Sequence, residues 1–273
     1  MIWELRRPGN CKALLIDSIE RIVNPQRLLP PIVMRTRVGS PFSDVHGQQF
    51  ESIGRHFRVK LIEDAGLSVA SRVLDLGSGC GRLAIPLTGV IGSSGSYFGL
   101  EAVQSMVRWC QRHITPRFPH FRFVHADVRN RFYNRRGKEN PEGYRFPFDE
   151  HQFDLIIATS VFTHLQPGAM QNYISQCSRV LQPGGRFFAT FFVLENGDCS
   201  ADGGLQFRHG VSDIASTTNP TSPEAAIAYR IHWLMEVFSE SHLELLLPIR
   251  WGNWTGKNHE YSWQDVLIFE KRR

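Results

Sequence analysis

Three glycines alternate with small residues between Gly77 and Gly81, and an acidic residue, Asp75, stands just before them. The apolar residues ahead of Asp75 favour a β-strand, and the apolar pattern that opens at Leu83 favours a helix. Because glycine reaches positive φ without a Cβ penalty, such a turn is tight and lets a ligand approach its backbone. The N–H groups that begin the helix would face that ligand. The segment therefore predicts a cofactor-binding turn.

The spacing of the glycines separates two kinds of cofactor. A dinucleotide turn has the pattern Gly-x-Gly-x-x-Gly, whose third glycine lets the helix pack closely on the strand. When the pattern is counted from Gly77, that third position holds Arg82. A nicotinamide-dependent oxidoreductase is therefore disfavoured. A cofactor with an amino group, a sulfonium and no pyrophosphate would instead use the carboxylate of Asp75.

The elements around this turn indicate the fold. Strand and helix patterns alternate through the middle of the chain, which favours right-handed βαβ units and a mainly parallel sheet. Five strands are expected in that region, at 72–76, 96–100, 121–125, 153–159 and 186–194. Two more, at 243–249 and 264–270, follow each other without a helix between them, so we expect an antiparallel pair. The predicted fold class is α/β, a Rossmann-like three-layer sandwich with a mostly parallel seven-stranded sheet.

Residues 1–66 are expected to form an N-terminal extension that ends in a lid helix. Prolines interrupt its first part, where 13–23 is a short amphipathic segment. Apolar residues at helical spacing then run up to Gly66, which suits a helix C-terminus, and Ser43 or Asp44 suits the N-cap. This helix should lie just before the first strand.

Residues 67–273 are expected to form the main domain, with insertions at about 129–149 and 195–221. The second insertion is polar and rich in Gly, Ser and Thr, so we expect a long loop or lid there. From Ser222 onwards a proline and an acidic residue mark a helix start, and apolar residues at helical spacing continue it to Phe238.

Residues 73–81, Val-Leu-Asp-Leu-Gly-Ser-Gly-Cys-Gly, resemble the first motif of class I S-adenosylmethionine-dependent methyltransferases. The other motif positions of that family follow in order along the chain. Glu101 ends the second strand, Asp127 ends the third, and residues 181–185 resemble the family's Leu-x-Pro-Gly-Gly segment before the fifth strand. The resemblance implies S-adenosyl-L-methionine as the cofactor and methyl transfer as the reaction. It is strongest to bacterial small-molecule or glycan O-methyltransferases.

The resemblance also implies how residues would contact the cofactor. Glu101 would accept the ribose hydroxyls, Asp127 would lie near the adenine amine, and Val128 would offer its backbone N–H to the adenine ring. Arg82 would either contact the cofactor carboxylate or stand exposed on its helix. The expected cofactor-binding residues are Asp75, Gly77, Ser78, Gly79, Gly81, Arg82, Glu101, Ala102, Met106, Asp127, Val128, Ser160 and Val161.

Two histidines are the expected catalytic residues. A hydroxyl acceptor must lose a proton during methyl transfer, and histidine is the side chain that most often accepts it. His164 stands just past the fourth strand, and His209 lies in the second insertion. A purely structural hydrogen bond to the backbone is the alternative role for His164. No cluster of oxygen ligands indicates a magnesium site, so no metal is expected.

The formal net charge is +5, and the densest basic cluster lies at 129–138. That cluster would be a solvated loop, a site for phosphate or carboxylate on the substrate, or a nucleic-acid contact. An RNA or protein methyltransferase is therefore the alternative function. The Asn/Asp-Pro-Pro-aromatic motif of the family's nucleic-acid and amide N-methylating members is replaced by Thr-Ser-Val-Phe at 159–162. The expected acceptor is a small molecule or glycan, and nucleic acid is disfavoured.

Five scattered cysteines form no Cys-x-x-Cys pair, so neither a disulfide framework nor a zinc site is indicated. No apolar run is long enough to span a bilayer, and charged residues occupy the N-terminus where a signal peptide would be apolar. A cytoplasmic location is expected, and the oligomeric state is left open.

Overall fold

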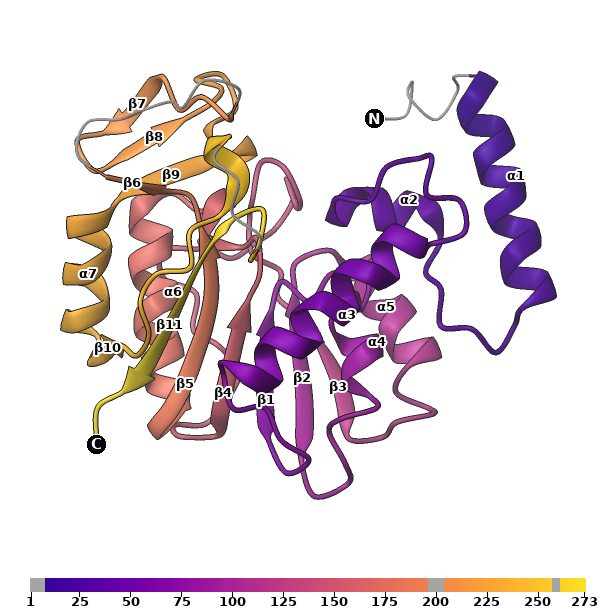
Figure 1. The fold of residues 1–273 in the computed structure, drawn as a ribbon, viewed down its shortest axis with the longest axis horizontal. Helices are drawn as coiled ribbons and strands as arrows, with labels where there is room; N and C mark the ends of the chain where they lie inside the picture. The colour runs from indigo at the N-terminus through magenta and orange to yellow at the C-terminus, as the bar shows by residue number, and fades with distance from the viewer. Residues whose placement is uncertain (1–7, 196–203, 257–260) are drawn as a thin grey trace.

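The computed structural model describes residues 8–195, 204–256 and 261–273 (Figure 1). Its main sheet has seven strands in the order β10-β11-β5-β4-β1-β2-β3. The strands are β1 Arg72–Leu76, β2 Ser96–Glu101, β3 Phe121–His125, β4 Phe153–Ala158, β5 Leu181–Phe191, β10 Leu243–Leu245 and β11 Asp265–Lys271. Strands β1 to β5 pair in parallel, whereas β11 is antiparallel to both β5 and β10. The predicted α/β fold with its antiparallel C-terminal pair is confirmed.

Strand β1 occupies the point at which the strand order reverses. The chain proceeds from β1 through β2 to β3 on one side, and β4 then pairs with β1 on its other side. In open α/β sheets, the crevice beyond the carboxyl ends of the strands at such a point is the usual ligand site. The glycine turn after β1 opens into this crevice.

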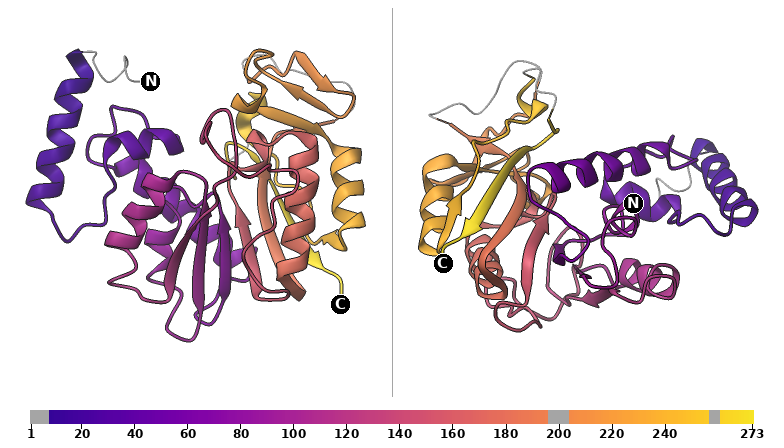
Figure 2. Two further views of the ribbon diagram at one scale, coloured as in Figure 1. Left: turned by 180° about the vertical axis from the view of Figure 1, so that it is seen from behind. Right: turned by 60° about the horizontal axis from the view of Figure 1, so that its bottom comes forward.

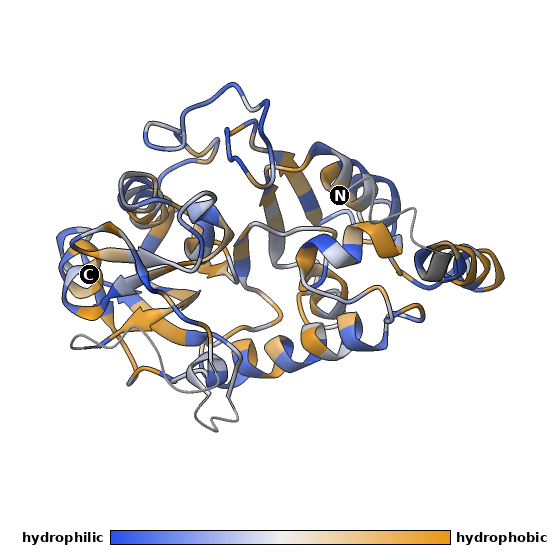
Figure 3. Ribbon diagram, turned by 90° about the horizontal axis from the view of Figure 1, so that it is seen from above, coloured by the Kyte–Doolittle hydropathy of each residue, from blue (hydrophilic) through white to orange (hydrophobic). Residues whose placement is uncertain are grey.

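Helices cover both faces of the sheet, which gives the expected three layers (Figure 2). One face is covered by α3 Gln48–Glu63, α4 Ala84–Leu87 and α5 Gln104–His113, and the other by α6 Pro167–Val180 and α7 Ile231–Glu240. Successive strand residues alternate between the two cores, so Val73 packs on the first face and Leu74 on the second. Seen from above, the helix ribbons alternate between hydrophobic and hydrophilic residues, as helices with one buried face do (Figure 3).

Helix α3 is the helix that was predicted to end the N-terminal extension. Asp44 satisfies its first turn, because the two carboxylate oxygens accept the N–H groups of Gln49 and Phe50 at 3.0 Å each. Beyond its end, Gly66 takes the left-handed conformation with φ of 72°. Asp44 therefore provides the capping carboxylate that the sequence indicated, although Gly47 is the residue immediately before the helix.

A buried arginine holds the rest of the N-terminal segment together. Helix α1 Pro8–Val23 is followed by α2 Ile32–Arg35 and a 3₁₀ turn, η2 Thr36–Val38. The guanidinium of Arg35, fully buried, donates to a carboxylate oxygen of Asp17 at 2.6 Å and to the main-chain oxygen of Pro30 at 2.9 Å. A second nitrogen lies 3.5 Å from a carboxylate oxygen of Asp44. Arg35 thus ties α1 and the start of α3 to the turn that precedes the cavity.

A second, four-stranded sheet replaces the loop that was predicted after β5. Its strands are β6 Val193–Leu194, β9 Ile227–Arg230, β8 Ala215–Thr217 and β7 His209–Ser212, in that order. The expected helix start at Ser222 is wrong: Pro223–Ala225 is a 3₁₀ turn (η4), and α7 begins only at Ile231. Pairing of β9 with both β6 and β8 overrides the helical spacing of its apolar residues. Residues 196–203 of the expected loop lie outside the described residues.

Within the described ranges, no helix combines the length and apolar character that a bilayer crossing requires.

Candidate functional site

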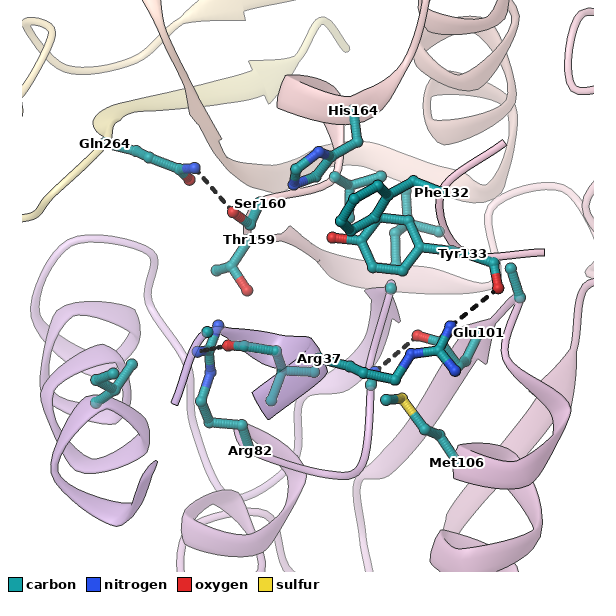
Figure 4. Close-up of a pocket in the computed structure, with 18 of the residues that line it drawn as sticks. Arg37, Arg82, Glu101, Met106, Phe132, Tyr133, Thr159, Ser160, His164 and Gln264 are labelled. Carbon is teal, nitrogen blue, oxygen red and sulfur yellow. Dashed lines mark hydrogen bonds between the residues drawn. The ribbon is translucent and has the colours of Figure 1, made fainter. Parts of the chain in front are cut away.

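A cavity of about 950 Å³ opens beyond the carboxyl ends of the parallel strands (Figure 4). Its lining comes from the glycine turn, the ends of β2, β3 and β4, the N-terminal segment, α3, the insertion after β3 and the segment before β11. Small-ligand sites span about 300–1,000 Å³, so this cavity is large enough for a cofactor together with part of an acceptor. The predicted residues that line it are Gly77, Gly79, Arg82, Glu101, Ala102, Met106, Val128, Ser160, Val161 and His164.

The glycine turn leaves no room for side chains. Gly77, Gly79 and Gly81 have φ of 64°, 56° and 87°, which other residues adopt only with strain. A Cβ on Gly77 would lie 2.7 Å from Val161, and one on Gly79 would lie 2.7 Å from Val38. Gly81 faces away from the cavity, toward α5. The helix predicted to follow, α4, has only four residues, so its dipole is a minor part of the site.

Glu101 connects the end of β2 to this turn. One carboxylate oxygen accepts the N–H of Gly79 at 2.8 Å, and the other accepts the N–H of Val103 at 2.7 Å. Burial raises the pKa of Glu101, and these two N–H groups oppose that rise. Each oxygen keeps a further lone pair, so the carboxylate can still accept hydrogen bonds from a ligand in the cavity.

Asp75 does not line the cavity, contrary to the expectation of direct cofactor contact. Its side chain is buried and accepts a hydrogen bond from the Tyr97 hydroxyl. The other oxygen, Oδ1, has no partner among the described residues. The reason is the alternation of β1: Leu76 reaches the cavity, whereas Asp75 faces the α3–α5 side of the sheet with Tyr97. Ser78, whose buried hydroxyl has no hydrogen-bond partner in the described ranges, also lies outside the lining.

The expected adenine contacts are only partly in place. Asp127 does not line the cavity, and its carboxylate accepts a hydrogen bond from Asn134 at 3.2 Å. Val128 does line it, but its N–H donates to the carbonyl of Ala126 at 2.7 Å. The prediction that this N–H is free for a ligand is therefore wrong, because the chain turns tightly as it leaves β3.

Two arginines join the N-terminal segment to the cavity. The guanidinium of Arg82 donates to the main-chain oxygen of Val38, and burial lowers its pKa. Arg82 is therefore a cavity residue and not an exposed helix side chain. Arg37 donates to the main-chain oxygen of Tyr133 at 3.1 Å. Arg37 and Tyr133 were not predicted, because neither belongs to a motif and both reach the site only through tertiary packing.

His164 closes a 3₁₀ turn, η3 Phe162–His164, at the end of β4. Its Nδ1 lies 2.8 Å from the main-chain oxygen of Glu224, and burial lowers the pKa of the ring. The ring is parallel to that of Phe132, with centroids 6.3 Å apart, and meets Tyr133 edge to face at 5.3 Å (Figure 4). His164 therefore makes the backbone hydrogen bond of the structural alternative and lines the cavity as well.

Ser160 is held in the left-handed region, with φ of 59°, by a ring of hydrogen bonds. Its N–H donates to the hydroxyl of Thr190 at 2.8 Å, and that hydroxyl donates to the Gln264 amide oxygen at 2.5 Å. The Gln264 amide nitrogen donates to the Ser160 hydroxyl at 2.8 Å (Figure 4). The hydroxyl proton of Ser160 is thus left to donate elsewhere. Gln264, which also lines the cavity, was not predicted.

The structure does not place His209 at the cavity. It is exposed on β7, the edge strand of the second sheet, and does not line the cavity. The sequence placed it in a lid, but this part of the insertion folds into a hairpin with β8 instead. Among the described residues, no group of three or more His, Cys, Asp or Glu side chains is arranged to hold a metal ion.

Comparison with known proteins indicates the same class of domain as the fold and the glycine turn do. Residues 73–185 match the family described as a methyltransferase domain. Over 125 residues the chain is 30% identical to the tRNA N(3)-cytidine methyltransferase METTL2 of Xenopus tropicalis. That match covers 44% of this chain and 33% of the relative, so the aligned part spans about a third of the relative's length.

Two solved structures share the fold at low sequence identity. The [4+2]-cyclase SpnF is 16% identical with a TM-score of 0.54, over 80% of each chain. The 1,6-didemethyltoxoflavin-N1-methyltransferase of Burkholderia thailandensis, solved with S-adenosylhomocysteine, is 16% identical with a TM-score of 0.51, over 98% of this chain and 92% of that chain.

The cavity suits the cofactor of this family. Gly77 and Gly79 line the cavity without side chains of their own, and a buried carboxylate stands at the end of β2, where it can accept hydrogen bonds from hydroxyl groups. The family match, the order of the seven strands and this pairing of turn and carboxylate agree. Residues 73–185 therefore match a methyltransferase domain, and the chain around them has the fold of class I S-adenosylmethionine-dependent methyltransferases.

Proposed function

We propose that this protein transfers a methyl group from S-adenosylmethionine to a hydroxyl oxygen of a small-molecule or glycan acceptor, with His164 as the general base. The observation that carries this proposal is the 2.8 Å contact between His164 Nδ1 and the main-chain oxygen of Glu224. A carbonyl oxygen only accepts hydrogen bonds, so Nδ1 carries the proton. Because burial lowers the pKa of the ring, the ring is neutral near pH 7 and Nε2 is free to accept a proton.

In this proposal Gly77 and Gly79 would hold the cofactor. Glu101 would accept hydrogen bonds from the ribose hydroxyls, and Ala102, Met106 and Val128 would line the adenine pocket. Arg82 and the unpredicted Arg37 are the cations available to the cofactor carboxylate. S-adenosylmethionine supplies a methyl group that is activated for in-line displacement by its bond to a sulfonium sulfur.

The chain's contribution to catalysis is alignment and proton removal. Helix α3 and the N-terminal segment line one side of the cavity, and the insertion after β3 lines another, so a bound acceptor is flanked by these segments. Holding the acceptor oxygen against the methyl carbon removes much of the entropy cost of the reaction, and exclusion of water protects the cofactor from hydrolysis. His164 Nε2 then accepts the hydroxyl proton as the new bond forms.

Methylation of RNA is the second candidate. It is favoured by the 30% identity to the METTL2 protein over 125 residues and by the exposed basic side chains of the insertion after β3. Binding of transfer RNA that weakens steeply as salt rises would support this candidate. Absence of binding at low salt would remove it.

The test of the proposed function is cofactor binding followed by turnover. S-adenosylhomocysteine should raise the unfolding midpoint, because a ligand that binds only the folded state stabilises it. Glu101→Gln should abolish that shift, whereas Glu244→Gln, a surface carboxylate paired with Arg272, should leave it unchanged. Labelled S-adenosylmethionine should then methylate hydroxyl compounds from a panel of phenols, sugars and alcohols. No midpoint shift at well above micromolar S-adenosylhomocysteine would contradict the proposal.

A further inference from the structure

We propose that the outer part of the cavity is an acceptor site for a planar ring that carries an anionic group, a carboxylate or a phosphate. This inference rests on the proposed function and narrows it, because it names the chemical class of the acceptor and favours an aromatic small molecule over a glycan.

Two exposed aromatic side chains, Phe132 and Trp263, line the outer part of the cavity. In the described part of the chain these are the two exposed Phe or Trp side chains, at 54% and 52% exposure, and both line the cavity. They come from separate segments, the insertion after β3 and the segment before β11. Large aromatic side chains left in water at the mouth of a cavity mark a surface that a ligand covers. Their flat faces pack best on another flat ring.

Phe132 adjoins the proposed base. The rings of Phe132 and His164 are parallel to within 5°, with centroids 6.3 Å apart, and Tyr133 closes the corner between them. A ring that packs on the same face of Phe132 as His164 would therefore lie beside the histidine. A phenolic hydroxyl has a pKa of about 10, and it loses a proton to a neutral imidazole more readily than an aliphatic alcohol does.

The charge of the cavity favours an anion. Three arginines line it, at positions 37, 82 and 129, against one carboxylate, Glu101. Arg37 and Arg82 are bonded to main-chain oxygens of Tyr133 and Val38. Arg129 is exposed, and its side chain has no ion-pair or hydrogen-bond partner among the described residues. Because the cofactor itself carries two positive groups and one carboxylate, an anionic acceptor complements the site, and Arg129 is free to bind it.

Calorimetry in the presence of S-adenosylhomocysteine tests the site with matched probes. We expect 4-hydroxybenzoate to bind about tenfold more tightly than 4-hydroxycyclohexanecarboxylate, which lacks the flat ring, and than 4-hydroxybenzyl alcohol, which lacks the charge. Cytidine 5′-monophosphate serves as the phosphate arm. Tighter binding of the nucleotide would assign the anion as phosphate, and tighter binding of the benzoate would assign it as carboxylate.

Variants then attribute each preference to a side chain. Phe132→Leu should remove most of the preference for a planar ring, and Arg129→Gln should remove most of the preference for the anion. Val69→Ala and Arg208→Gln, exposed positions that do not line the cavity, should change neither. The inference fails if no ring compound binds at millimolar concentration, if flat and non-planar probes bind equally, or if only transfer RNA binds.

Turnover separates this inference from the proposed function. If the hydroxybenzoate binds with both preferences but no methyl transfer to its oxygen is detected, the ring site stands and hydroxyl methylation is wrong. If neutral, non-planar alcohols are methylated as efficiently as hydroxybenzoate, hydroxyl methylation stands and the ring site is wrong.

Discussion

The hydroxyl of Tyr97 donates a hydrogen bond to the carboxylate of Asp75 directly behind the glycine turn, and both side chains are buried. The second carboxylate oxygen has no partner among the described residues. Burial therefore outweighs the hydrogen bond and raises the pKa of Asp75 to about 7. The most prominent acid of the cofactor motif thus titrates near neutral pH in the free protein.

Asp75→Asn should change how stability depends on pH. The folded state holds the carboxyl proton up to about pH 7, whereas the unfolded chain releases it near pH 4, so the free energy of unfolding falls as pH rises between those values. Asparagine does not titrate. We expect the variant to be more stable than the wild type at pH 8, by on the order of 1 to 4 kcal/mol, with the advantage vanishing near pH 4.

Urea denaturation between pH 4 and pH 8 measures this difference. Asp213→Asn, at an exposed position, serves as the control and should leave the pH dependence unchanged. A wild-type slope retained in Asp75→Asn would show that Asp75 titrates normally.

Gly79→Ala should lower both stability and cofactor affinity. The residue has φ of 56°, and an added Cβ would lie 2.7 Å from Val38, so the N-terminal segment must move. We expect a loss of about 1–3 kcal/mol in unfolding free energy and a drop of about tenfold or more in S-adenosylhomocysteine affinity. Gly143→Ala is the matched control, because no atom lies within 4 Å of its added Cβ. Equal effects at the two glycines would contradict the geometry of the turn.

Arg35→Met should loosen the N-terminal segment, although Arg35 itself does not line the cavity. Its removal leaves Asp17 and Asp44 buried beside an uncharged side chain, which costs about 3–5 kcal/mol. Hydrogen exchange should accelerate in α1 and at the start of α3, and S-adenosylhomocysteine affinity should fall because Arg37 and Val38 follow directly in the chain. Arg21→Met removes a part-exposed partner of the same Asp17 and should cost no more than about 1 kcal/mol. Unchanged exchange in Arg35→Met would argue against this anchoring role.

The parts of the fold that could be predicted are those fixed by local pattern. The third strand was expected at 121–125 and is Phe121–His125, and the antiparallel pair followed from two strand patterns with no helix between them. The second sheet could not be predicted in the same way. Strand β9, Ile227–Arg230, carries apolar residues at positions that also suit a helix, and only its pairing with β6 and β8 decides the outcome.

The candidate site also contains some residues that local sequence pattern could predict and others that it could not. Glu101 was recognisable because a strand ends there and its carboxylate must lie beside the turn. The orientation of Asp75 depends on which face of β1 it occupies, and the blocked N–H of Val128 depends on a turn geometry that residue types do not specify. Arg37 and Tyr133 come from segments that reach the cavity only through the packing of the whole molecule.

The central claim is that the domain transfers methyl groups with His164 as the base, and His164→Asn tests it most directly. The asparagine amide can still donate to the Glu224 carbonyl, so the turn is kept while the lone pair of Nε2 is lost. His209→Asn, on the exposed edge strand, is the control. The measurement is methyl transfer from labelled S-adenosylmethionine to a hydroxyl acceptor over pH 5 to 9, with S-adenosylhomocysteine affinity measured in parallel.

The wild-type rate should fall only at a pH below the ordinary histidine pKa of about 6.5, because burial lowers the pKa of the ring and keeps it neutral at and above that value. His164→Asn should reduce kcat about 10²–10⁴-fold and leave S-adenosylhomocysteine affinity unchanged, while His209→Asn should match the wild type. A His164→Asn variant that keeps wild-type kcat, or that loses cofactor affinity and turnover together, would contradict the assignment of His164 as the base.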